Sequence, residues 1–240
     1  PRNLSGKRLK ELIRRLEKHR GLLIAFEGPD GAGKTTQRKL FKTWLQGKGH
    51  KVAVSKWNSS ELIKPLVKAR KSLQALSPLE YCLLHAADFR HRLEHEIMPA
   101  LCEGKIVIAD RFLFNALARD VVRGLDMDWV LKLYNPLLWP DMVFYFSVTP
   151  ETSGKRILSE RAPTYYEAGQ DATEIEDPSA SYQEFISRVI LEYDALALIF
   201  QFLTIDAEQS VYAQHLKIRS LFEKGTRRTW PEFNLEAVED

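Results

Sequence analysis

The sequence predicts a single α/β domain in which helices flank a five-stranded parallel sheet. Five short apolar runs are candidate strands, helical patterns separate all of them, and a glycine-rich motif follows the first. The runs are apolar at nearly every position instead of alternating with polar residues, which is typical of parallel strands buried on both faces. A chain of 240 residues with 45% hydrophobic and 28% charged residues has the length and composition of one globular domain.

The predicted elements follow in order along the chain. An accessory helix is expected over residues 5–20, where leucine and isoleucine recur at helical spacing among basic residues, with a membrane-surface helix as the alternative. The predicted strands are residues 22–26, 52–54, 106–109, 143–146 and 202–205. A helix is expected from the glycine-rich motif to about residue 48, and a long helical region over residues 78–103.

The pattern divides the chain into three parts. We expect an N-terminal accessory helix (1–20), a central domain (21–225) and an irregular C-terminal tail (226–240). Residues 161–180 are rich in Pro, Thr, Tyr, Gly, Asp and Ser, and a polar excursion of this length is usually either disordered or a functional lid. We predict a short lid there.

Composition narrows the possible partners. A net charge of +3, with acidic and basic residues interleaved, does not favour a nucleic-acid-binding protein. Cys82 and Cys102 are expected to be reduced core thiols of a cytoplasmic protein. No apolar run approaches the roughly 18 residues of a membrane span. We therefore expect a cytoplasmic protein that binds neither nucleic acid nor membranes.

A phosphate-binding motif follows the first predicted strand. Residues 28–35, Gly-Pro-Asp-Gly-Ala-Gly-Lys-Thr, fit the pattern G-x-x-x-x-G-K-[ST] between a strand and a helix. Glycines allow backbone N–H groups to turn towards phosphate oxygens, the lysine reaches the β- and γ-phosphates, and the threonine hydroxyl binds Mg²⁺. The predicted ATP-binding residues are Gly28, Gly31, Ala32, Gly33, Lys34, Thr35 and Thr36. The motif predicts a P-loop NTPase.

Residues 26–37, Phe-Glu-Gly-Pro-Asp-Gly-Ala-Gly-Lys-Thr-Thr-Gln, resemble the signature of the thymidylate kinase family. Residues 83–88 and 106–112, Pro140-Asp141 and residues 205–207 also resemble family segments, in the same order along the chain. The resemblance implies a nucleoside monophosphate kinase that transfers the γ-phosphoryl group of ATP, with Mg²⁺, and dTMP is the first expected acceptor. It also implies a homodimer.

The resemblance further implies roles for individual residues. Asp30 would accept the 3′-hydroxyl of the acceptor sugar, Arg111 would hold the acceptor phosphate, and Asp110 would lie near the Mg²⁺ held by Thr35. Two anionic phosphates must be brought together, so a cation is needed at each, and a bidentate arginine suits an acceptor phosphate.

The family places a catalytic arginine either in the phosphate-binding loop or in the lid. Gly31 occupies the loop position here, so Arg161 at the start of the lid is the expected catalytic arginine, with Arg156 as the second candidate. The predicted catalytic residues are therefore Lys34, Asp110, Arg111 and Arg161.

The acceptor side departs from the family pattern. Lys56-Trp57-Asn58-Ser59-Ser60 stands where Arg-Glu-Pro-Gly-Gly is usual, Phe89 replaces an arginine, and Ala118-Arg119-Asp120 replaces Ala-Tyr-Gln. The predicted acceptor-binding residues are Asp30, Lys56, Trp57, Phe89, Arg111, Phe112, Asn115 and Arg119, and Trp57 either stacks on a base or packs in the core. The alternatives left open are a kinase for another (deoxy)nucleotide or a nucleoside, and a non-catalytic ATP-binding regulatory domain.

Overall fold

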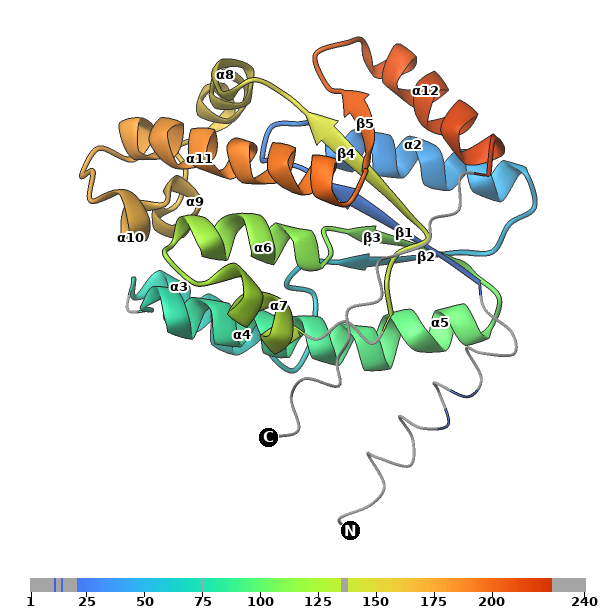
Figure 1. Cartoon of the computed structure of the whole chain (residues 1–240), viewed down its shortest axis with the longest axis horizontal. Helices are drawn as coiled ribbons and strands as arrows, with labels where there is room; N and C mark the ends of the chain where they lie inside the picture. Colours follow the sequence, from blue (N-terminus) through green and yellow to red (C-terminus); the bar gives the residue numbers. More distant parts are fainter. Residues whose placement is uncertain (1–10, 12–13, 15–20, 75, 135–137, 226–240) are drawn as a thin grey trace.

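The computed structural model describes residues 21–225 except 75 and 135–137, together with residues 11 and 14. The predicted accessory helix, apart from those two residues, and the predicted tail therefore lie outside the described residues. Figure 1 shows the described part as a central sheet with helices on both faces. Within it, none of the helices is both long enough and apolar enough to cross a bilayer.

The sheet has five strands, all parallel, in the order β2-β3-β1-β4-β5. The strands are β1 (Leu22–Glu27), β2 (Val52–Lys56), β3 (Ile106–Asp110), β4 (Met142–Ser147) and β5 (Leu203–Asp206). This confirms the predicted α/β fold class and all five predicted strands. Because β1 lies between β3 and β4, the loop that follows it opens at the centre of the sheet edge, where α/β proteins bind their ligands.

Each face of the sheet packs against its own hydrophobic core. Ile24 and Phe26 of β1 belong to the core under α2 (Lys34–Gly47) and α12 (Val211–Glu223). Leu23 belongs to the opposite core, which is formed with the other helices. These side chains are fully buried, which explains why β1 reads as a continuous apolar run.

The remaining helices are mostly on the second face (Figure 1). They are α3 (Lys64–Ser72), α4 (Pro78–Arg92), α5 (Met98–Cys102), α6 (Leu113–Val122), α7 (Met127–Tyr134), α8 (Pro150–Glu160), α9 (Tyr165–Ala168), α10 (Gln170–Thr173) and α11 (Pro178–Ile199). Cys82 is buried in this region and Cys102 is half-buried, and the two cysteines form no disulfide.

The long helical region predicted over residues 78–103 contains a change of helix type. It begins with a capping box between Ser77 and Glu80. A π-helical turn, η1 (Leu93–Ile97), then separates α4 from α5. Pro99 follows the π turn and has no N–H for a helical hydrogen bond, so a local widening of the helix accommodates it. Hydrophobic periodicity does not register a single widened turn, which is why the sequence analysis missed it.

The polar segment predicted as a lid folds into two short helices, α9 and α10. Thr164 and Glu167 form a capping box at the start of α9. The Arg123 guanidinium joins α6 to this segment, because its Nε donates to Asp171 at 2.7 Å and its Nη2 donates to the Tyr166 carbonyl at 2.8 Å. The second half of the segment is therefore anchored to the domain by a buried ion pair.

Candidate active site

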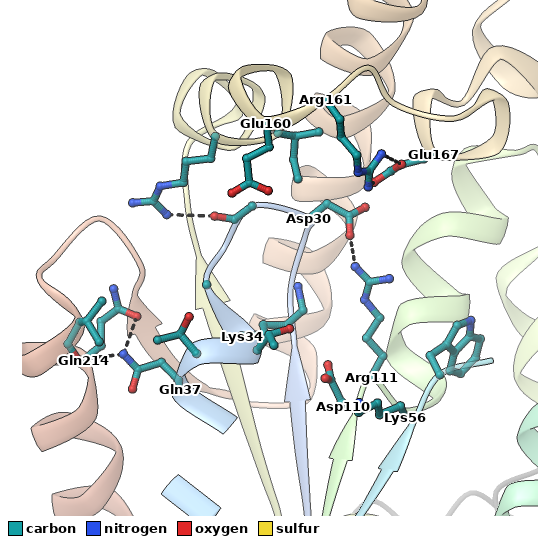
Figure 2. Close-up of a pocket in the computed structure, with 18 of the residues that line it drawn as sticks. Asp30, Lys34, Gln37, Lys56, Asp110, Arg111, Glu160, Arg161, Glu167 and Gln214 are labelled. Atoms are coloured by element: carbon teal, nitrogen blue, oxygen red, sulfur yellow. Dashed lines mark hydrogen bonds and ion pairs between the residues drawn. The ribbon is translucent and has the colours of Figure 1, made fainter. Parts of the chain in front are cut away.

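A cavity of about 690 Å³ opens at the carboxyl ends of the central strands (Figure 2). Its volume is within the range of small-molecule sites. Its walls come from the loop after β1, the ends of β2 and β3, helix α8, the start of the lid, and the loop and helix that follow β5. The cavity therefore extends to both sides of the phosphate-binding loop.

Close packing requires glycine at two positions of this loop. Gly28 has φ 135°, and a Cβ atom there would lie 2.7 Å from the Phe146 carbonyl oxygen. Gly31 has φ 72°, and its Cβ would lie 2.9 Å from the Ser153 carbonyl oxygen. Both conformations disfavour any residue with a side chain. Gly31 thus leaves no room for an arginine within the loop, so an arginine that reaches the cavity has to come from another element.

Lys34, the first residue of α2, ties the phosphate-binding loop back on itself. Its Nζ donates to the Gly28 carbonyl at 2.8 Å and also to the Pro29 carbonyl. Burial lowers the pKa of Lys34 to about 7, and the nearby positive charge of Arg111 adds to the effect, while Asp30 opposes it. A phosphate bound beside Lys34 would favour the charged ammonium form of this side chain.

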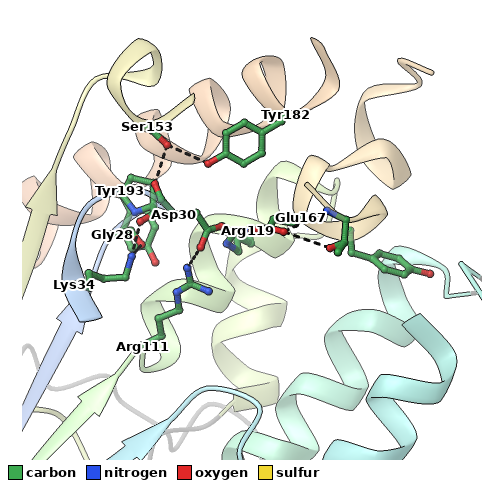
Figure 3. A network of polar contacts seen from close by, with 12 residues as sticks. Gly28, Asp30, Lys34, Arg111, Arg119, Ser153, Glu167, Tyr182 and Tyr193 are labelled. Carbon is green, nitrogen blue, oxygen red and sulfur yellow. Dashed lines mark hydrogen bonds and ion pairs between the residues drawn. The ribbon is translucent and has the colours of Figure 1, made fainter. Parts of the chain in front are cut away.

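Asp30 pairs with two arginines (Figure 3). Its Oδ1 accepts from Arg111 Nη2 and its Oδ2 accepts from Arg119 Nη2. Burial alone would raise the pKa of Asp30, but Arg111, Arg119 and Lys34 outweigh it and hold that pKa well below its usual range. Asp30 is therefore an anion at the centre of a cationic cluster.

The backbone of Arg111 adopts a left-handed conformation, with φ 68°, directly after β3. Such a conformation is uncommon for a residue with a side chain and is found where the surroundings enforce it. The Phe112 N–H donates to Glu27 Oε1 at 2.7 Å, and Tyr193 OH donates to Glu27 Oε2 at 3.1 Å. Burial raises the pKa of Glu27 to about 7, against these hydrogen bonds and the charge of Arg111. Glu27 thus fixes the turn that presents Arg111.

Asp110 connects the cavity to the neighbouring strand. It is the last residue of β3 and pairs in register with Lys56 of β2. Its carbonyl accepts from the Trp57 N–H at 3.0 Å, and its carboxylate forms an ion pair with Arg38 Nε at 2.9 Å. Lys56, Trp57 and Asp110 all line the cavity.

Trp57 lines the cavity next to Lys56 and packs on a layer of aromatic rings. Its ring is nearly parallel to those of His85 and Tyr134. The ring centroids are 6.0 Å and 6.2 Å away, and the interplanar angles are 10° and 15°. Phe89 and Phe112 lie beneath this layer, fully buried and in edge contact at 4.9 Å. The structure therefore places Phe89 and Phe112 in the core that supports Trp57, outside the cavity wall.

Two arginines of α8 and the lid face the phosphate-binding loop. Arg161 forms a bidentate ion pair with Glu167, both N–O distances being 2.7 Å. Arg156 donates to the Gly31 carbonyl at 3.0 Å and to the Ala207 carbonyl at 3.1 Å. Both arginines line the cavity. Arg156 reaches the residue that follows β5, and Arg161 faces Glu167 of the lid (Figure 2).

The structure brings most of the predicted site residues to one cavity. Its lining includes Asp30, Gly31, Gly33, Lys34, Thr35, Thr36, Lys56, Trp57, Asp110, Arg111 and Arg161. Gly28, Ala32, Phe89, Phe112, Asn115 and Arg119 do not line it. The sequence analysis did not identify Gln37, Ile157, Glu160, Glu167, Gln209, Val211 and Gln214, which do. The Thr-x-x-Glu pattern of residues 164–167 was a usable signal for Glu167, since it marks a helix start.

Oxygen donors suited to Mg²⁺ meet in the same cavity. The Thr35 side chain and the Asp110 carboxylate both line it. The described residues contain no cluster of three or more His, Cys, Asp or Glu side chains able to hold a metal ion by themselves. This donor set fits Mg²⁺, which usually takes one or two protein ligands and completes its shell with phosphate oxygens and water.

Comparison with known proteins identifies one family. The family profile described as thymidylate kinase matches residues 26–218. The chain is 39% identical over 204 residues to the probable thymidylate kinase 2 of Saccharolobus solfataricus, covering 84% of this chain and 95% of the relative. It is 33% identical over 207 residues to the thymidylate kinase of Caldanaerobacter subterraneus subsp. tengcongensis, covering 82% and 92%. It is 31% identical over 214 residues to the probable thymidylate kinase of Thermococcus gammatolerans, covering 85% and 97%.

Proposed function

The chain belongs to the thymidylate kinase family, and from this premise we propose that it transfers the γ-phosphoryl group of ATP to dTMP, giving ADP and dTDP. The observation that carries this proposal is the arrangement of Lys34 and Arg111. They line one cavity, Lys34 from the start of α2 and Arg111 from the turn after β3, and both are close to Asp30. A donor phosphate at Lys34 and an acceptor phosphate at Arg111 would therefore face each other.

The donor occupies the arm of the cavity that runs from the phosphate-binding loop towards β5. The loop N–H groups and Lys34 hold the β- and γ-phosphates. Gln209 and Val211 line the far end of this arm, beyond Arg156. The adenine base lies there, with the planar Arg156 guanidinium beside it.

The acceptor occupies the opposite arm, over β2 and β3. Arg111 binds its phosphate, Lys56 adds a second positive charge, and the half-buried Trp57 ring, which lines the cavity, offers a surface for the base. Stacking on an aromatic face tolerates several bases, because every base has a π-face. The specificity of this arm therefore depends on few polar groups.

Transfer needs positioning and neutralisation of charge, with no covalent intermediate on the protein. An oxygen of the acceptor phosphate attacks the γ-phosphorus, and the bond from that phosphorus to the β,γ-bridging oxygen breaks. Lys34 and Arg161 stabilise the charge that develops on the transferring group. Thr35 and Asp110 would hold Mg²⁺, which would supply positive charge to neutralise the β- and γ-phosphates. The lid, over about residues 161–180, excludes water.

Three finer proposals accompany this function, the first from the family resemblance, the second from cysteine usage and the third from the order of elements along the chain. These are that the enzyme is a homodimer, that it works in the cytoplasm, and that residues 21–225 form the kinase domain. Sedimentation of the purified chain tests the first of them, and a monomer at micromolar concentration would contradict it.

The test of the proposed function is an ADP-release assay with ATP, Mg²⁺ and a panel of acceptors. The panel contains dTMP, dUMP, dCMP, dGMP, dAMP, UMP and thymidine, and Lys34→Ala is the control. We expect the wild-type enzyme to show its highest kcat/KM with dTMP. Lys34→Ala should release no ADP above background with any acceptor. Preference for another acceptor would indicate that Arg119 and Asp120, which replace the family's Tyr-Gln, have changed the specificity. ATP binding without turnover of any acceptor would contradict the kinase assignment.

A further inference from the structure

Arg119 lies behind the acceptor arm of the cavity. It belongs to α6, its side chain is 7% exposed, and it does not line the cavity. Figure 3 shows its guanidinium reaching Asp30 from α6, while Arg111 reaches the same carboxylate from the end of β3. Asp30 thus has one guanidinium partner inside the cavity and one behind it.

The surroundings of Arg119 hold its guanidinium in one orientation. The guanidinium carbon lies 5.6 Å from the ring centroid of Phe185 on α11, within cation–π range. Its Nε is buried without a hydrogen-bond partner among the described residues. In that part of the chain, Asp30 is the carboxylate that forms an ion pair with Arg119. Movement away from Asp30 would leave a buried charge uncompensated, which is strongly unfavourable.

The backbone of Asp30 is fixed separately from its side chain. Its carbonyl accepts from Ser153 Oγ at 2.8 Å, and Ser153 in turn contacts Tyr182 OH at 3.1 Å. The Asp30 side chain is 16% exposed and lines the cavity. An anchored backbone and a buried partner on Oδ2 leave Oδ1 as the oxygen that can exchange partners.

We propose that Arg119 is a positioning residue, which holds Asp30 so that one carboxylate oxygen faces the cavity and accepts a hydrogen bond from the 3′-hydroxyl of the acceptor sugar. This inference rests on the proposed function. It assigns to Arg119, which stands where the family has tyrosine, a role through Asp30 in place of direct contact with the acceptor.

An exchange of partners on binding follows from the geometry. The acceptor phosphate attracts Arg111, because a dianionic phosphate offers more oxygens to a guanidinium than Asp30 does. Oδ1 of Asp30 then loses Arg111 and needs a new donor, while Arg119 keeps Oδ2. The sugar hydroxyl is the nearest donor that the acceptor carries beside its own phosphate. Without Arg119, no buried guanidinium holds Oδ2, and the Asp30 carboxylate rotates to follow Arg111 when Arg111 binds the phosphate.

The experiment compares dTMP with 3′-deoxythymidine monophosphate, which lacks only the 3′-hydroxyl. We expect the wild-type enzyme to favour dTMP in kcat/KM by about 10- to 100-fold, the size of one hydrogen bond to a charged group. Arg119→Gln should reduce this preference to within about threefold and leave the KM for ATP unchanged. Arg119→Lys, which keeps the charge and loses the planar fork, should give an intermediate preference. Arg188→Gln removes an exposed arginine of α11 and is the matched control.

The preference ratio separates positioning from general damage. A structural role for Arg119 predicts an equal loss with both acceptors, and that result would overturn the proposal, as would a wild-type ratio in Arg119→Gln. If the glutamine variant does not fold, Arg119→Lys decides, and an unchanged ratio in that variant would also overturn it. Failure of the wild-type enzyme to phosphorylate dTMP would instead refute the proposed function, so the two failures are distinguishable.

Discussion

Glu27→Gln should gain stability over the wild type as the pH rises, because the wild type loses unfolding free energy when the buried Glu27 ionises. Glu27 is fully buried, and burial raises its pKa from 4.5 to about 7. The folded state therefore binds the Glu27 proton more tightly than the unfolded state does. The contribution of this proton to the free energy of unfolding is complete below pH 4.5 and is lost as the pH rises through 7.

The size of the effect follows from the same pKa values. A change from 4.5 to about 7 corresponds to about 3 kcal/mol of unfolding free energy. Glutamine has the same shape and no charge, and its side-chain oxygen can still accept from the Phe112 N–H. Urea unfolding of the wild type and Glu27→Gln at pH 4.5, 6, 7 and 8 measures the difference between the two proteins. We expect this difference to move by about 3 kcal/mol in favour of the variant across that range.

Glu27→Leu separates the charge of Glu27 from its hydrogen bonds. Leucine leaves the Phe112 N–H and the Tyr193 hydroxyl buried without an acceptor, at a cost of about 1–3 kcal/mol each. The turn that presents Arg111 would loosen, so kcat/KM should fall much further in Glu27→Leu than in Glu27→Gln. A pH-independent stability difference for the glutamine variant, or equal activity of the two variants, would refute this account of Glu27.

Three further predictions follow from the geometry of the site. Because burial lowers the pKa of Lys34 to about 7, the Kd for ATP should rise towards tenfold per pH unit above pH 7, and Lys34→Arg should lose this dependence in a binding titration. Asp171→Asn removes the ion-pair partner of the buried Arg123 and should destabilise the fold by about 3–5 kcal/mol, whereas Glu167→Gln breaks a half-exposed pair and should cost at most about 1 kcal/mol in urea unfolding. Trp57→Ala should raise the KM for the acceptor by about 5- to 100-fold without changing the KM for ATP, since base stacking contributes about 1–3 kcal/mol.

The fold and the donor half of the site could be predicted from sequence because local rules determine them. The five strands are continuous apolar runs between turn residues, and the phosphate-binding loop is a contiguous motif between a strand and a helix. The sequence alone shows that Gly31 leaves the phosphate-binding loop without an arginine. The structure adds the physical reason, which is that a Cβ atom would meet the Ser153 carbonyl.

The acceptor half was harder to predict because tertiary packing determines it. Phe89 and Trp57 are both aromatic residues expected near the acceptor, yet Phe89 is fully buried and Trp57 lines the cavity. Phe89 lies on α4, none of whose residues lines the cavity, and sequence periodicity does not show which partners an apolar helix residue packs against. The ion pair between Arg119 and Asp30 joins residues 89 positions apart, and no local pattern relates them.

The most direct test of the two-armed site is a measurement of both KM values in Arg111→Lys. Lysine keeps the positive charge and loses the bidentate fork that suits the acceptor phosphate. The account predicts that the KM for dTMP rises by about 10- to 100-fold, as for the loss of one charge-assisted hydrogen bond, while the KM for ATP stays at the wild-type value. An equal rise in the two KM values would contradict it, because Arg111 would then serve the donor as much as the acceptor.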